Sequence, residues 1–164
     1  MMVALAVTFM LLSYFPYLTF AIPGIAGMFI MAIVIEIDCK WAIGGFLASA
    51  FFVLLFAEPE SAFMFAGFLG YYPILKATLE KMRKPVVEWA IKVICFNIAV
   101  CAVYFLLSKL TGFSTEEFGK FAEYGVWILL ALGNIVFVVY DIAVSRVAMV
   151  YMSVIRPKLE KIIK

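Results

Sequence analysis

Apolar positions dominate this chain in long runs, and the breaks between the runs consist of prolines, glycines and charged residues. A run of about 20 apolar residues is long enough to cross a bilayer as a helix. If the breaks are helix ends, the pattern predicts an all-α fold, a polytopic membrane bundle of about six transmembrane helices. The predicted helices cover residues 2–15, 22–37, 41–57, 61–80, 85–109 and 115–156.

The first two predicted helices are separated only by a weak turn signal. Residues 1–35 carry no charge, and only Pro16, Pro23 and Gly24 favour a turn. One long kinked helix is therefore the alternative to two spans. The first run also lacks a basic leader and a convincing small-residue cleavage site, so we expect it to be retained as a span.

Basic residues gather on one side of the membrane if six spans start from a cytoplasmic amino terminus. Of the 13 lysines and arginines, only Lys109 and Lys120 then fall outside. This asymmetry follows the positive-inside rule. It predicts a multi-pass protein of the cell membrane with both termini cytoplasmic. Residues 1–156 would form a single transmembrane helical domain, and residues 157–164 a basic cytoplasmic tail.

The composition agrees with a chain that has the lipid bilayer as its solvent. Hydrophobic residues make up 67% of the sequence and charged residues 15%, against about 25% charged residues in soluble domains. The net charge of +2 gives no sign of a nucleic-acid partner. There are no histidines, the three cysteines form no CxxC pair, and there is no P-loop. We therefore expect no metal, no other cofactor and no enzymatic activity.

A strongly basic stretch separates the fourth and fifth predicted helices. Its cationic residues are Lys76, Lys81, Arg83, Lys84 and Lys92. The simplest interpretation is an anchor, whose long side chains extend to the lipid headgroups. The alternative is a docking surface formed by Lys81, Arg83 and Lys84. It is favoured because Lys76, Glu80 and Lys84 recur every fourth residue and share a helix face.

Two asparagines lie deep within the last two predicted helices. Asn97 and Asn134 are each about 11 residues from the outer end of their helix, so antiparallel helices would hold them at nearly equal depth. At 100° per residue, each continues a polar stripe along its helix. One stripe consists of Asn97, Cys101, Tyr104 and Ser108, and the other of Glu123, Trp127, Asn134, Asp141 and Ser145. We expect the stripes to face each other or a shared cavity.

These stripes have two interpretations. In the first, the Asn97 and Asn134 amides pair across the two helices, a contribution of about 0.6 kcal/mol on average in membrane proteins. In the second, the stripes line an outward-opening substrate site that also includes Glu123. There the amides bind a solute's polar groups, and Tyr104 and Trp127 stack on its apolar part. These two aromatic residues equally fit the aromatic belt of a membrane interface.

Asp141 is a separate candidate, because it lies below Asn134, towards the cytoplasm. An ionisable residue at that depth in a membrane helix is a functional candidate by default. Interfacial exposure, or a hydrogen bond to Ser145 four residues later, would explain it without a function. Small residues spaced by four, such as Gly44 with Ala48, indicate helix faces for close packing.

Residues 22–56, "IPGIAGMFIMAIVIEIDCKWAIGGFLASAFFVLLF", resemble the second and third helices of the substrate-binding S component of energy-coupling factor (ECF) vitamin transporters. The number of spans in a short chain without a nucleotide motif is also similar to that family. The resemblance implies a subunit that captures a vitamin or small nutrient from the outer face through helices 4 to 6. Its partners would be transmembrane scaffold and ATPase subunits.

One feature of that family is missing. Its first helix usually meets the scaffold through alanines in a small-xxx-small motif, whereas Ala4 and Ala6 stand two residues apart. The alternative function is a noncatalytic integral membrane scaffold or interaction subunit. The bacterial rod-shape-determining membrane subunit is a similarly small bundle of that class.

Overall fold

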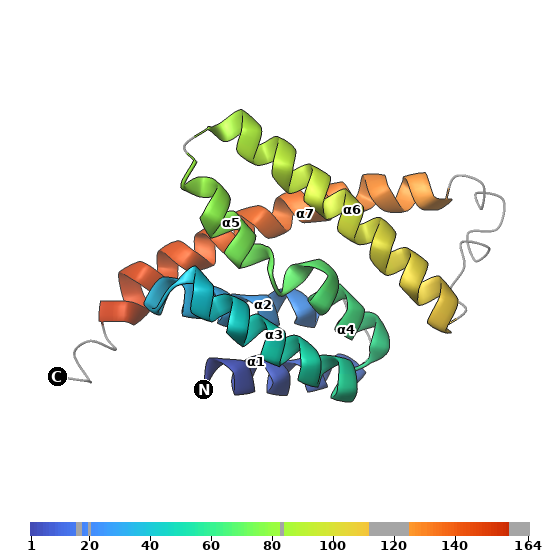
Figure 1. Cartoon of the computed structure of the whole chain (residues 1–164), viewed down its shortest axis with the longest axis horizontal. Coiled ribbons are helices and arrows are strands. Elements are labelled where there is room, and N and C mark those ends of the chain that lie inside the picture. Colours follow the sequence, from blue (N-terminus) through green and yellow to red (C-terminus); the bar gives the residue numbers. More distant parts are fainter. Residues whose placement is uncertain (16–17, 20, 83, 112–124, 158–164) are drawn as a thin grey trace.

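A computed structural model of the chain describes residues 1–15, 18–19, 21–82, 84–111 and 125–157 (Figure 1). Over these residues the chain is helical and has no β-strand, which confirms the all-α prediction. The α-helices are α1 (Met2–Met10), α2 (Ala21–Glu36), α3 (Cys39–Phe56), α4 (Pro59–Met64), α5 (Tyr72–Glu80), α6 (Pro85–Thr111) and α7 (Gly125–Val150). The 3₁₀ turn η1 (Leu11–Tyr14) extends α1, the π-helical turn η2 (Phe65–Leu69) follows α4, and the π-helical turn η4 (Tyr151–Ile155) follows α7.

Four segments of the described chain are long and apolar enough to cross a membrane. They are Cys39–Phe56, Pro59–Glu80, Pro85–Leu106 and Leu130–Ile155. The helices at Met2–Tyr14 and Ala21–Glu36 are apolar but shorter. Large apolar side chains cover the outside of the bundle, as at Leu47, Ile98 and Val139. The fold is therefore compatible with a membrane-embedded protein.

The first two predicted helices are separate elements that pack against each other. The rings of Phe9 in α1 and Phe29 in α2 lie 5.1 Å apart. In one continuous helix, residues 20 positions apart would be separated by about 30 Å. The alternative of a single long kinked helix is therefore wrong.

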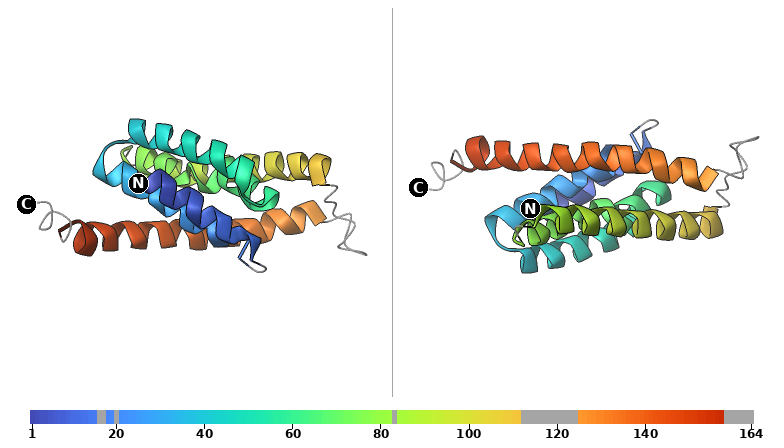
Figure 2. Two further views of the ribbon diagram at one scale, coloured as in Figure 1. Left: turned by 90° about the horizontal axis from the view of Figure 1, so that it is seen from below. Right: turned by 90° about the horizontal axis from the view of Figure 1, so that it is seen from above.

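Helix α2 lies between two apolar cores. Ile30 packs in a core with residues of α1, α3 and α4, whereas its neighbour Met31 packs in a second core with residues of η2, α5, α6 and α7. Figure 2 shows the result, with α3 and α7 on opposite sides of the bundle. The second core is rich in aromatic rings, whose contacting pairs have centroids 4.7–5.6 Å apart. These rings belong to Phe68, Tyr72, Phe96 and Phe137.

The segment formed by α4, η2 and α5 is broken near its middle, although the sequence predicts one continuous helix there. The Gly70 N–H donates to the Phe65 carbonyl (2.8 Å), five residues earlier. Pro73 has no N–H to donate to the Leu69 carbonyl, four residues earlier. That carbonyl instead accepts a hydrogen bond from the Tyr140 hydroxyl of α7 (3.1 Å). The break thus connects this segment to α7.

Candidate functional site

Asn97 of α6 and Asn134 of α7 face each other and form a reciprocal pair. Each side-chain amide donates to the carbonyl oxygen of the other, at 3.1 and 3.0 Å. Each also donates to a backbone carbonyl one turn earlier, of Val93 (2.8 Å) and Leu130 (2.7 Å). One N–H of each amide therefore bonds across the two helices, and the other bonds within its own helix. This geometry is the paired arrangement considered above, and a role of these amides in binding a solute stays a prediction.

Replacing Asn97 by Leu is expected to lower the free energy of unfolding by about 1 kcal/mol, because Asn134 loses its partner. The Asn97→Leu/Asn134→Leu variant should be no less stable than the single variants. If each single variant loses about 1 kcal/mol, the coupling between the two positions is about 1 kcal/mol, within the range for residues in contact. Unfolding of the four proteins in mixed detergent micelles measures this coupling. Strictly additive effects would contradict the pairing.

A cavity of about 510 Å³ lies between α2, α4, η2, α6 and α7. Most of the residues that line it are apolar, and three of them are the phenylalanines Phe68, Phe96 and Phe137. Glu60 is the charged residue among the described residues of the wall. Pockets for small molecules commonly have this size and character, with a few polar groups among apolar ones.

The cavity has a charged end and an aromatic end. Glu60 lies in the first turn of α4. We call this the Glu60 end of the bundle, where α2 and α4 begin and α6 ends (Figure 1). Phe68 follows Glu60 by eight residues, about 12 Å along a helix. The aromatic rings therefore lie deeper in the bundle than the carboxylate.

Among its described residues, the predicted substrate site overlaps with this cavity at Tyr104 alone. Tyr104 lines the cavity, whereas Asn97 and Asn134 are not among its lining residues. Trp127 does not line it either and exposes 71% of its surface. Glu123 lies outside the described residues. The structure thus brings the asparagines together, but not around the cavity.

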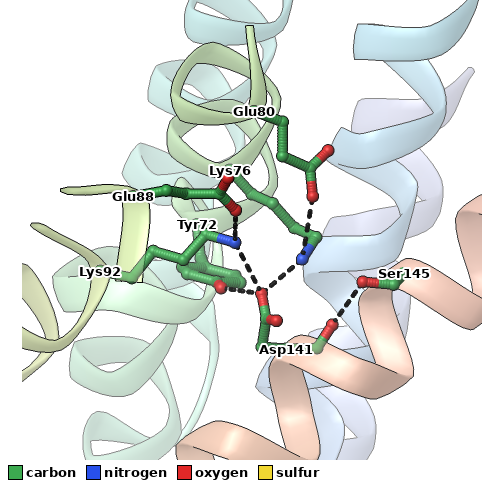
Figure 3. Close-up of polar contacts among 7 residues, drawn as sticks. All are labelled: Tyr72, Lys76, Glu80, Glu88, Lys92, Asp141 and Ser145. Carbon is green, nitrogen blue, oxygen red and sulfur yellow. Dashed lines mark hydrogen bonds and ion pairs between the residues drawn. The ribbon is translucent and has the colours of Figure 1, made fainter. Parts of the chain in front are cut away.

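A largely buried group of charged and hydroxyl side chains joins α5, α6 and α7 (Figure 3). We call it the Asp141 cluster, and it consists of Tyr72, Lys76, Glu80, Glu88, Lys92 and Asp141. One carboxylate oxygen of Asp141 accepts hydrogen bonds from the Tyr72 hydroxyl and from the Lys76 ammonium. The same oxygen accepts one from Lys92 at 3.2 Å. Lys76 also pairs with Glu80 at 3.2 Å, and Lys92 with Glu88 at 2.5 Å.

The burial of this cluster corrects the interpretation of Lys76 and Lys92 as membrane anchors. Only 7% of the Lys76 side chain and 1% of the Lys92 side chain are exposed. Both ammonium groups turn inwards to Asp141, so neither acts as an anchor that extends to the headgroups. Lys81 and Lys84 are exposed, and Arg83 lies outside the described residues. The docking role of these three residues stays a prediction.

Neither simple explanation of Asp141 holds. Its side chain is only 8% exposed, so interfacial exposure is wrong. The Ser145 hydroxyl donates to the backbone carbonyl of Asp141 at 2.9 Å and not to its carboxylate. The two lysines are what compensate the charge. Asp141 is therefore a buried carboxylate whose partners come from two other helices, and a functional role for it stays a prediction.

Tyr72 connects the cavity to the Asp141 cluster. Its ring packs against Phe68 and Phe137, which line the cavity, with centroids 5.0 and 5.4 Å away. Its hydroxyl donates to Asp141. The aromatic end of the cavity therefore lies next to the Asp141 cluster.

Sequence reasoning missed this cluster because it assigned each lysine to the nearest membrane edge. A usable signal was present in the spacing. Tyr72, Lys76 and Glu80 recur every fourth residue, and Glu88 and Lys92 are also four apart. Such spacing places each set on one helix face, inside runs that are otherwise largely apolar.

No group of three His, Cys, Asp or Glu side chains suited to a metal ion occurs in the described part of the chain.

Comparison with protein-family models, with curated proteins and with solved structures finds no match to this chain. The geometry of the cavity and of the Asp141 cluster is therefore what indicates its function.

Proposed function

We propose that the chain is a noncatalytic, membrane-embedded binding subunit that holds a small, largely apolar solute in the cavity between α2, α4, η2, α6 and α7. The observation that carries this proposal is the cavity itself, about 510 Å³ in volume with mostly apolar walls. A gap of this size is typical of a site that a molecule fills.

The broken helix beside the cavity supports the same function. Phe68 and Leu69 of η2 line the cavity. Irregular backbone at membrane depth is tolerated where it is buried in protein or lines a cavity, and discontinuous helices form the substrate sites of many transporters. Single π-helical turns are also frequent at functional sites.

The direction of entry follows from the distribution of basic residues. With a cytoplasmic amino terminus, the Glu60 end faces outwards, so the cavity takes its solute from the outer face. The resemblance to the ECF S component adds a wider role to this binding. The chain would capture a vitamin or small nutrient and pass it on with transmembrane scaffold and ATPase subunits as partners.

Replacing Val100 by Trp is expected to weaken binding of 2-phenylethanol, a small apolar probe, by about tenfold or more. Val100 of α6 lines the cavity, and an indole there would occupy the space of the solute. The measurement is a binding titration of the protein in lipid nanodiscs. Mass spectrometry of the purified wild-type protein would in addition identify a retained small molecule.

The matched control is Ile98→Trp on the same helix. Ile98 does not line the cavity and exposes 65% of its surface, so an indole there points away from the site. Its affinity for 2-phenylethanol should equal that of the wild-type protein. Equal affinity of the Val100→Trp and Ile98→Trp variants would overturn the assignment of the cavity as the binding site.

A noncatalytic membrane scaffold is the second candidate function. It is favoured by the Asn97–Asn134 pair, in which the polar stripes close on each other. Exposed Lys81 and Lys84, with Arg83, would then dock a cytoplasmic or membrane partner. A purified protein that carries a stoichiometric partner protein and no small molecule would favour this function over solute binding.

A further inference from the structure

Glu60 places one carboxylate side chain at an otherwise apolar cavity. It lines the cavity and is partly buried. Among the described residues, no lysine or arginine forms an ion pair with it. A carboxylate in the first turn of a helix is favoured by the helix dipole. The helix dipole would favour a carboxylate on any face of the first turn of α4. It therefore does not explain why Glu60 lies on the face that lines the cavity.

A charge in an apolar wall has a free-energy cost unless a partner offsets it. The partner best suited to a carboxylate is a cation that also donates hydrogen bonds, because charge-assisted hydrogen bonds are stronger than neutral ones. At the other end of the cavity, Phe96 and Phe137 are stacked with centroids 4.7 Å apart and planes inclined by 12°. Phe68 packs edge-on against both. This end suits a flat apolar group.

We propose that the cavity selects an amphiphilic amine, with its protonated nitrogen at Glu60 and its aromatic or alicyclic body against Phe68, Phe96 and Phe137. The inference rests on the proposed function and adds the chemical class of the solute. The separation of about 12 Å along the helix between the carboxylate and the rings suits a body of one or two rings. An anionic solute of the same shape is rejected, because its charge would meet Glu60.

Three probes with one skeleton, long enough to reach from Glu60 to the aromatic rings, test this inference: 5-phenylpentylamine, 5-phenylpentanol and 6-phenylhexanoate. They are titrated against the protein in phosphatidylcholine nanodiscs, whose lipid has no net charge to attract the amine. The wild-type protein should bind the amine about tenfold more tightly than the alcohol, and the carboxylate most weakly. Glu60→Gln should remove the advantage of the amine and leave the affinity for the alcohol unchanged.

Glu58→Gln is the matched control, since Glu58 lies next to the same helix start but does not line the cavity. It should keep the preference for the amine. Equal affinities of the wild-type protein for the three probes, or a preference that survives Glu60→Gln, would overturn the inference and leave the binding function intact. Loss of alcohol binding in Glu60→Gln would make Glu60 a structural residue and also overturn it. If the wild-type protein binds none of the probes, the proposed function fails as well.

Discussion

Replacing Asp141 by Asn should lower the free energy of unfolding by about 3 kcal/mol, at the lower end of what is found when one partner of a buried ion pair is removed. The change keeps the shape of the side chain but removes its charge from between two buried ammonium groups. The loss is limited because Lys76 keeps Glu80 and Lys92 keeps Glu88 as partners. Unfolding in mixed detergent micelles measures the difference.

The control for this prediction is Glu80→Gln. Glu80 belongs to the same cluster, but its side chain is 52% exposed, so its pair with Lys76 is a surface pair. Such pairs contribute about 0–1 kcal/mol. If Asp141→Asn were no more destabilising than Glu80→Gln, the buried carboxylate would not be what holds α5, α6 and α7 together.

A combined variant tests whether the fold needs the charges of the Asp141 cluster or only side chains of similar size. Asp141→Leu together with Tyr72→Phe, Lys76→Met and Lys92→Gln removes the charges of Asp141 and its two lysines, leaves no unpaired hydroxyl at position 72 and leaves a donor for Glu88. Replacing buried ion networks by apolar groups of similar size is often neutral or stabilising. This variant should therefore recover most of the stability that Asp141→Asn loses.

Gly27→Ala is expected to destabilise the fold by about 2 kcal/mol, within the range for overpacking a well-packed interior. A Cβ atom on Gly27 would lie 2.4 Å from the Leu69 carbonyl oxygen and 2.9 Å from the Tyr140 hydroxyl. The hydroxyl donates to that same carbonyl, which Pro73 leaves without its usual helical partner. The methyl group would push α2 away from η2 and disturb the hydrogen bond. Binding of 2-phenylethanol should weaken too, because Leu69 and Tyr140 line the cavity.

Gly44→Ala is the matched change on α3. Apart from its chain neighbours and the backbone of its own helix, no atom lies within 4 Å of the position of its Cβ. Glycine is about 1 kcal/mol less favourable than alanine inside a helix, so this variant should be as stable as the wild-type protein or slightly more stable. Similar losses for Gly27→Ala and Gly44→Ala would show that close packing at Leu69 is not the cause.

The helices were predictable because their signals are local. The apolar runs and their breaks placed the first five helical segments within a few residues of where the structure has them, and α1 and α2 are separate helices, as the prediction of two helices requires. The predicted start of the last helix, at residue 115, lies outside the described residues. The break at Gly70 and Pro73 was missed. An uninterrupted apolar run does not show that a tyrosine 67 positions after Pro73 will take the hydrogen bond that proline leaves open.

The two polar features of the bundle differ in how far they could be predicted. Asn97 and Asn134 lie on consecutive antiparallel helices, where depth and helix face follow from counting residues. Asp141 was recognisable as unusual, but its partners were not. Lys76 and Lys92 lie near helix ends, where a lysine has two outcomes: it extends to the headgroups or turns into the bundle.

The amino-acid sequence alone establishes an all-helical chain with segments apolar enough for a membrane, their approximate ends, and the equal depth of two asparagines. These properties depend on hydrophobicity, helix breakers and periodicity within one or two neighbouring helices. Tertiary packing decides which lysines turn towards Asp141 and where a cavity opens with Glu60 on its wall. Both depend on how several helices are rotated against one another, and that rotation is set by the sum of many weak contacts between residues far apart in the chain.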